Sequence, residues 1–173
     1  MLIVIDTSDS MGAAIAAVEA SINDDFAAIL EASGIPYQVI VAGEYPAICI
    51  IAPLSGADCN PPPAVPAITE VYEHYGASTG SGSFLSNILA WYAAPDPYGF
   101  APTGYQEWLR EDSLKVILAM TDGASASGDP DDGIAFDQQL LALVPPRFGT
   151  PGDRQYVFHT ITSMNANEPA TAP

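Results

Sequence analysis

The sequence predicts an α/β fold: a doubly wound, mostly parallel sheet between two layers of helices. Short apolar runs typical of buried parallel strands occur at 2–5, 37–42, 114–120 and 155–161. Segments in which apolar residues recur at helical spacing lie between them, at 12–32, 83–92 and 134–144. Strands that alternate with helices are characteristic of a parallel sheet with crossover helices.

The first strand and helix carry the clearest pattern. Residues 2–5 form a continuous apolar run rich in β-branched side chains, as a fully buried strand requires. In the segment 12–32, Ile15, Val18 and Ile22 continue a three- and four-residue spacing. Gly34 then supplies the residue that commonly follows the end of a helix.

The next apolar runs predict one antiparallel hairpin. Residues 37–42 and 47–52 are both strand-like, and only the turn-like segment 43–46 separates them. A connection this short can join antiparallel strands but not parallel ones. A loop rich in proline and glycine follows at 53–66, and 67–75 is compatible with a short helix or an extended segment.

The second half of the chain continues the alternation. We expect one or two helical turns at 105–110, an acidic loop of small residues at 124–132, and a helix at 134–144 that ends at two prolines. The length is that of one domain, which we assign to 1–164, followed by a polar tail at 165–173.

The charge balance excludes several partners. The 21 acidic residues face only 4 basic ones, which gives a formal charge of -17. Nucleic acid and anionic membrane surfaces require clustered Lys and Arg, so neither is an expected partner. No run of about twenty apolar residues is present, so no transmembrane segment is predicted. The chain begins directly at its first predicted strand, so we expect a trimmed fragment or mature form, and the start of the chain says little about its compartment.

The two cysteines leave two alternatives. Cys49 lies in a strand-like run and Cys59 in the polar loop that follows it. This arrangement is compatible with one disulfide that closes a short loop, and low lysine with abundant proline and glycine favours a secreted protein. The alternative is two unpaired thiols, one of them buried. Zinc is not expected, because two cysteines and two distant histidines do not make a zinc site.

A cluster of oxygen-bearing side chains follows the first strand. Asp6, Ser8 and Ser10 occupy alternate positions directly after it, and Asp122 follows the later strand 114–120. Open α/β sheets bind ligands beyond the carboxyl ends of their strands. Carboxylate and hydroxyl oxygens suit hard cations such as Mg²⁺, Mn²⁺ or Ca²⁺. The two serines could also simply cap the helix that follows, but capping does not explain Asp122.

These residues resemble the metal-ion-dependent adhesion site of von Willebrand factor type A domains, whose signature is Asp-x-Ser-x-Ser. The resemblance implies that Ser8 and Ser10 bind the metal directly and that Asp6 and Asp122 bind it directly or through water. A hydroxyl from the loop 78–83 would complete the set. We expect Ser81, because its flanking glycines let the backbone approach the metal, with Thr79 and Ser83 as alternates.

The resemblance also implies a function and a location. A type A domain offers the open position of its Mg²⁺, Ca²⁺ or Mn²⁺ to an acidic group of a protein partner, which makes the chain an adhesion module. Four further segments resemble secreted or lipid-anchored type A proteins of bacteria such as myxobacteria; they are 80–82, 108–114, 148–150 and 156–161. This likeness implies an extracellular or cell-surface protein and supports a bridge between Cys49 and Cys59.

The same family usually continues with one more helix and strand. We therefore expect a sheet that lacks this last unit and has an open edge, at which a missing segment or another chain could pair. An alternative function is thus a structural subunit of an extracellular or cell-surface assembly. A metal-dependent hydrolase has less support, because His74 and His159 are isolated and no Gly-x-Ser-x-Gly motif occurs. We predict that the chain is not an enzyme.

Overall fold

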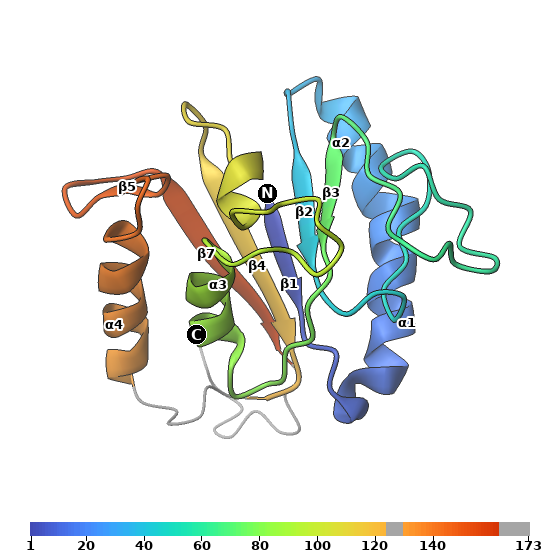
Figure 1. Cartoon of the computed structure of the whole chain (residues 1–173), viewed down its shortest axis with the longest axis horizontal. Coiled ribbons are helices and arrows are strands. Elements are labelled where there is room, and N and C mark those ends of the chain that lie inside the picture. The colour runs from blue at the N-terminus through green and yellow to red at the C-terminus, as the bar shows by residue number, and fades with distance from the viewer. Residues whose placement is uncertain (124–129, 163–173) are drawn as a thin grey trace, which may run out of the picture.

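The computed structural model describes residues 1–123 and 130–162, and in this part of the chain five strands form one parallel sheet. Their order across the sheet is β3-β2-β1-β4-β7 (Figure 1). The strands are β1 (Leu2–Ile5), β2 (Val39–Ala42), β3 (Tyr72–Tyr75), β4 (Lys115–Thr121) and β7 (Tyr156–Thr162). The predicted α/β class with a parallel sheet is therefore confirmed.

Helices lie between β1 and β2, between β3 and β4 and between β4 and β7, whereas a segment without a helix joins β2 to β3. The first predicted helix is a continuous helical segment of three parts: α1 (Gly12–Ser21), a π-helical turn (Ile22–Phe26) and α2 (Ala27–Ser33). Gly34 ends it with a φ of 65°, the left-handed conformation that glycine adopts most readily. The later elements are α3 (Phe84–Trp91), α4 (Pro130–Leu141) and two 3₁₀ turns (Asp9–Met11 and Tyr105–Trp108).

The two faces of the sheet bury different sets of side chains, because successive residues of a strand point to opposite faces. Leu2 and Val4 of β1 pack with apolar residues of α3 and α4. Ile3 and Ile5 pack with the residues around the π-helical turn on the other face. Figure 1 shows α1 and α2 on one side of the molecule and α3 and α4 on the other.

The predicted hairpin is wrong. Residues 47–52 form no strand of the sheet, and the strand beside β2 is β3, which runs parallel to it. The run 47–52 is apolar because it is a buried loop: Ile48 and Ile50 are almost fully buried in the core beside the π-helical turn. The antiparallel pair in the described residues is elsewhere and much smaller, between β5 (Gly149–Thr150) and β6 (Asp153–Arg154).

Side-chain hydrogen bonds and a disulfide hold this buried loop. Asn23, in the π-helical turn, accepts a hydrogen bond from the backbone N–H of Ile51 at 3.0 Å and donates one to the carbonyl of Cys49 at 3.5 Å. These contacts satisfy backbone groups that no strand partner satisfies. The predicted disulfide between Cys49 and Cys59 is present. The loop therefore replaces a strand without leaving these buried polar groups unpaired.

Other boundaries differ from the prediction in smaller ways. The helix expected at 134–144 begins earlier, at Pro130, so the end of the expected acidic loop 124–132 is helical. The remainder of that loop, 124–129, and the tail 165–173 lie outside the described residues. The helical turns expected at 105–110 are a single 3₁₀ turn, Tyr105–Trp108. None of the described helices has the length and apolar character needed to span a bilayer.

Candidate functional site

The candidate site lies where the strand order of the sheet reverses. From β1 the chain adds β2 and β3 on one side, and then returns to place β4 on the other side of β1. β1 and β4 are parallel neighbours, so their carboxyl ends meet at the same rim of the sheet. In open α/β sheets, this reversal leaves a crevice between the two strand ends in which ligands bind. Asp6 and Asp122 each follow one of these two strands.

Asp6 is a buried carboxylate whose two oxygens both accept hydrogen bonds. Its side chain is almost fully buried, and its backbone N–H donates to the carbonyl of Met120 across the strand pair at 2.9 Å. The N–H of Ser8 donates to Oδ1 at 2.9 Å, and the hydroxyl of Thr121 donates to Oδ2 at 2.8 Å. The orientation of the carboxylate is therefore set by both strands.

Ser8 and Ser10 lie side by side at the solvent-facing edge of the site. Their hydroxyl oxygens are 3.1 Å apart, and Ser8 is half-buried while Ser10 is exposed. A 3₁₀ turn, Asp9–Met11, follows Ser8 and brings the two hydroxyls to the same side. Neither serine makes a side-chain cap to the helical turns that follow, so the capping alternative has no support in the structure.

Ser81 connects the two carboxylates. Its hydroxyl donates to Oδ1 of Asp122 at 3.0 Å, and it lies close enough to Asp6 to lower the pKa of that carboxyl. Asp122 is half-buried at the end of β4. The structure thus joins Asp6, Asp122 and the loop that carries Ser81, although the three are far apart in the sequence.

Gly123 permits this close approach. A Cβ at position 123 would lie 2.3 Å from the Cβ of Ser81, a separation that side chains do not tolerate. The backbone after Asp122 can therefore lie against Ser81 only because residue 123 has no side chain.

The alternate loop hydroxyls have other partners. Thr79 is buried, and its hydroxyl accepts a hydrogen bond from Asn87 Nδ2 of α3 at 2.7 Å. Ser83 accepts from the same nitrogen at 3.3 Å and donates to the carbonyl of Gly80. Both hydroxyls hold the loop to α3, whereas Ser81 alone of the three contacts the carboxylates. This arrangement favours Ser81 as the loop residue of the site.

Asp6 is ionised at neutral pH. Burial raises the pKa of its carboxyl, but hydrogen bonds from the hydroxyl and N–H of Ser8 and from the hydroxyls of Ser81 and Thr121 together outweigh that effect. The pKa of Asp6 therefore lies below its usual value of 3.8. A buried negative charge satisfied only by neutral donors can still gain from a cation.

The donor set fits a hard divalent cation. It contains two carboxylates and three serine hydroxyls and no sulfur or imidazole, which suits Mg²⁺, Mn²⁺ or Ca²⁺ and not zinc. Within residues 1–123 and 130–162, no three His, Cys, Asp or Glu side chains come together to hold a metal. A cation here would therefore depend on the hydroxyls for part of its coordination.

Sequence reasoning missed two residues that build the site. Thr121 orients Asp6, and its oxygen also accepts the N–H of Gly123 at 3.2 Å. Asn87 fixes the loop that carries Ser81 through Thr79 and Ser83. Thr121 could have been suspected, because it lies directly before Asp122 at the end of its strand. Nothing in the sequence distinguishes Asn87 from other polar helix residues.

Other acidic residues stay outside this network. Asp9 is exposed in the 3₁₀ turn and makes no hydrogen bond to the site. Of the expected acidic loop 124–132, Asp129 lies outside the described residues and Asp132 lies in α4.

Comparisons with known proteins do not assign a family. No protein-family model matches the chain, and no curated protein or solved structure is significantly similar to it.

Proposed function

We propose that this chain is a metal-dependent adhesion module with the doubly wound fold of a von Willebrand factor type A domain. In this proposal a divalent cation at the rim of the sheet binds an acidic group of a protein partner. The proposal carries no catalytic step.

One observation carries the proposal. The five residues expected to bind the metal meet at the strand reversal in two hydrogen-bonded groups: Asp6, Ser8 and Ser10 form one, and Ser81 and Asp122 form the other. Ser81 lies close enough to Asp6 to lower the pKa of its carboxyl. They come from three separate segments, and helix capping or surface solvation alone would not bring them together. A metal site would explain why all three segments meet at one place.

The network suggests what each group would contribute. Ser8 and Ser10 would supply neutral oxygen ligands, and Asp6 and Asp122 the negative charge. Ser81 could ligate the cation through its oxygen and still donate its proton to Asp122, because a hydroxyl has two lone pairs besides its one donor. Two carboxylates that bind directly or through water, with neutral hydroxyls as the other ligands, would leave the charge of the cation partly uncompensated, so that its open position could bind an acidic group of a partner.

The disulfide agrees with the location that we propose. Disulfides persist mainly in oxidising compartments, and the bridge between Cys49 and Cys59 therefore favours an extracellular or cell-surface protein.

Metal titration tests the proposal. We expect calorimetry to detect one Mg²⁺ or Mn²⁺ per chain, and Asp6→Asn, Asp122→Asn and Ser81→Ala each to weaken binding at least tenfold. Water-proton relaxation of bound Mn²⁺ reports an open coordination position, and added acetate should lower it by replacing a water.

Asp9→Asn is the matched control, because it removes the same charge three residues from Asp6 but lies outside the network. Its affinity should stay within twofold of the wild type. Equal losses in Asp6→Asn and Asp9→Asn would mean that cations only condense on an acidic surface, and the proposal would fail.

A second candidate function, a subunit of a surface assembly, is favoured by one edge of the sheet. β7 has no charged residue, proline or glycine, the features by which proteins usually protect an edge. Val157 and Ile161 are 37% and 57% exposed, beside an apolar groove of about 350 Å³ formed by α1, the π-helical turn and β4. In a chain of charge -17, this uncharged edge is where a second copy could approach with least repulsion.

Metal dependence separates the two candidates. Contacts through β7 should survive EDTA and the Asp6→Asn variant, whereas Ile161→Lys should abolish them. Partner binding through the cation should be lost with EDTA and in Asp6→Asn, and it should survive in Ile161→Lys.

A further inference from the structure

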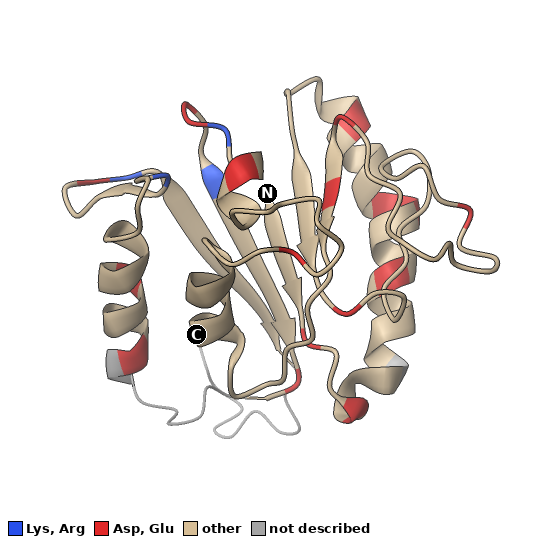
Figure 2. Ribbon diagram, in the orientation of Figure 1, with Lys and Arg blue, Asp and Glu red and all other residues tan. Residues whose placement is uncertain are grey.

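The few basic residues of the chain gather at the end of the sheet opposite the carboxylate site. There are four, Arg110, Lys115, Arg147 and Arg154. Lys115 opens β4, Arg154 lies just before β7, and the other two lie in loops at the same end. Figure 2 shows the basic segments at the end from which β4 and β7 start. Glu111, Asp112 and Asp153 lie at the same end, but no other part of this chain of 21 acidic residues has a Lys or Arg to attract an anion.

An apolar cavity opens among these residues. Its volume is about 340 Å³, and Leu30, Ile35, Trp108, Leu114 and Phe148 contribute to its lining together with Arg110 and Lys115. Ile35 and Leu114 are 69% and 62% exposed, so large apolar side chains remain in contact with water there. The size and composition are those of a small-molecule site: mostly apolar, with a few polar groups.

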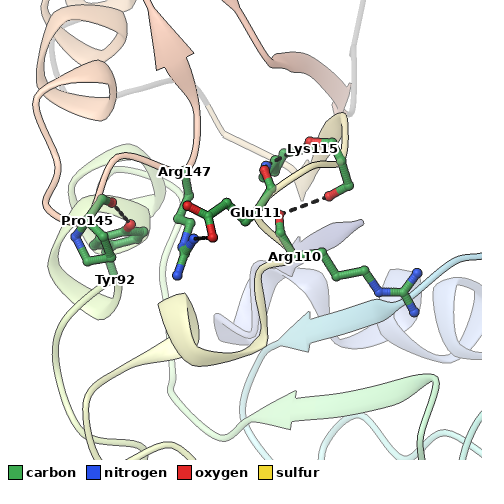
Figure 3. A network of polar contacts seen from close by, with 7 residues as sticks. Tyr92, Arg110, Glu111, Lys115, Pro145 and Arg147 are labelled. Carbon is green, nitrogen blue, oxygen red and sulfur yellow. Dashed lines mark hydrogen bonds and ion pairs between the residues drawn. The ribbon is translucent and has the colours of Figure 1, made fainter.

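Neither basic side chain that lines the cavity has an ionic partner among the described residues. In the described part of the chain the ion pairs are Arg147 with Glu111 and Arg154 with Asp137. Arg110 is exposed and donates only to the backbone carbonyl of Tyr37, at 3.0 Å. Figure 3 shows its guanidinium extending away from the pair of Glu111 and Arg147, which leaves it available to an anion.

Lys115 adds a second unpaired charge. Its side chain is buried, and its ammonium donates to the carbonyls of Glu111 and Ser113 at 2.8 and 2.7 Å. An ammonium has three donors, and a buried one is normally paired with a carboxylate. The buried lysine and the exposed arginine thus present positive potential to one apolar cavity.

We propose that this cavity binds a small anionic amphiphile, a carboxylate carried on an alkyl or aryl group. The carboxylate pairs with Arg110, whose planar guanidinium can donate two parallel hydrogen bonds to it. The apolar part fills the space between Trp108, Phe148 and Leu30. Polyanions such as nucleic acid are not expected, because two cations in a concave apolar site do not follow a phosphate backbone.

Decanoate is a suitable probe, measured by calorimetry on the full chain with decanol as the uncharged match. We expect one decanoate per chain, and decanol to bind at least tenfold more weakly. Arg110→Gln should weaken decanoate binding at least tenfold. Arg154→Gln removes the same charge outside the cavity lining and should leave the affinity within twofold. Ile35→Glu places a negative charge at the cavity mouth and should also abolish binding.

Several results would overturn this proposal. They are equal affinities for decanoate and decanol, equal losses in Arg110→Gln and Arg154→Gln, several molecules bound per chain, or no binding. Self-association that blocks decanoate would mean that a second copy covers the cavity. Because this site and the carboxylate site lie at opposite ends of the sheet, Asp6→Asn should leave decanoate binding unchanged, and the two proposals can fail separately.

Discussion

Asp6 shows how single hydrogen bonds decide the state of the candidate site. The carboxylate is buried at the centre of the network, and burial alone would favour its protonated form. Donors from Ser8, Ser81 and Thr121 reverse this preference, so the site is preset to be negative before any cation arrives. If any one of these donors is removed, the buried carboxylate of Asp6 is left with fewer hydrogen bonds.

Thr121→Val tests this point, because it removes the hydroxyl and nearly keeps the shape. We expect the free energy of unfolding at pH 7 to fall by about 1–3 kcal/mol, since Oδ2 of Asp6 loses a buried donor. Urea denaturation measures it. The depressed pKa of Asp6 stabilises the fold above its unfolded pKa, and this stability disappears as the pH falls through the native pKa. The difference between variant and wild type should therefore shrink below about pH 4.

The control for this variant is Thr160→Val, the same change at an exposed position of β7. It should alter stability by less than about 0.5 kcal/mol. A difference between Thr121→Val and wild type that stays constant from pH 7 to pH 3 would show that the hydroxyl acts only by packing.

At the scale of elements, β3 carries two adjacent titratable groups with opposite shifts. His74 is fully buried between the hydroxyl of Tyr72, 2.8 Å from Nδ1, and the carbonyl of Gly43, 3.1 Å from Nε2. Burial lowers its pKa to about 4, although the bond to Gly43 and the charge of Asp96 oppose this. Burial raises the pKa of the neighbouring Glu73 to about 7.

These shifts should nearly cancel in the wild type. A lowered histidine pKa gives stability that is present above 6.5 and lost as the pH falls toward 4, by up to roughly 3 kcal/mol. A raised glutamate pKa gives stability that is present below 4.5 and lost as the pH rises toward 7. We expect a shallow stability profile between pH 4.5 and 6.5 in the wild type, measured by urea denaturation.

Replacing either group should reveal the effect of the other on the pH dependence of stability. His74→Gln should lose stability as the pH rises through this window, because only Glu73 still titrates there. Glu73→Gln should gain stability over the same range. Parallel profiles for the two variants would contradict this account of β3.

The loop 47–59 is the element in which the disulfide acts. Ile48, Ile50 and Leu54 are buried, so the loop is part of the core although it contains no strand of the sheet. The bridge spans ten positions, and closing a loop of this length in the unfolded chain corresponds to roughly 2–3 kcal/mol of stability. Cys49→Ala/Cys59→Ala should lose about this amount in urea denaturation, and reduced wild type should match it. Equal stability of the oxidised and reduced protein would show that the disulfide does not stabilise the fold.

The sequence predicted most elements of this fold, and its failures have physical reasons. Strands β1, β2, β4 and β7 are apolar or β-branched runs, so periodicity alone found them. β3 was left open between a short helix and an extended segment, because Tyr72, Glu73, His74 and Tyr75 do not resemble a buried strand and their burial depends on partners contributed from elsewhere. The run 47–52 looked like a strand because burial by a loop and burial by a sheet select the same residues.

Some residues of the candidate site could likewise be predicted from the sequence, and others could not. Asp6, Ser8, Ser10 and Asp122 follow strands whose ends could be predicted, so their meeting at one rim followed from the topology. Ser81 lies in a loop, and its neighbours Thr79 and Ser83 have the same chemistry. Only the contacts of Asn87 and the space left by Gly123 distinguish the three.

At the scale of the whole molecule, charge is unevenly placed. All four basic residues lie at the starts of β4 and β7 or in the loops beside them, and the cluster of Asp6 and Asp122 lies at the far rim (Figure 2). Excess negative charge destabilises a compact chain by self-repulsion and attracts cations to the same surface. Added salt should therefore stabilise the metal-free fold and weaken its affinity for the metal.

Denaturation at two salt concentrations, with and without Mg²⁺, tests this prediction. Raising NaCl from about 0.02 M to 0.5 M shortens the screening length severalfold, so the metal-free protein should become more stable. The stabilisation by Mg²⁺ should shrink over the same range. At a hundredfold excess over Kd it is about 2.7 kcal/mol, and a tenfold loss of affinity would reduce it to about 1.4 kcal/mol. Asp6→Asn should keep the first response, and at low salt Mg²⁺ should stabilise it by no more than about 1.4 kcal/mol, because its affinity is at least tenfold weaker. An equal gain from Mg²⁺ in the variant and the wild type would place the cation elsewhere on the acidic surface.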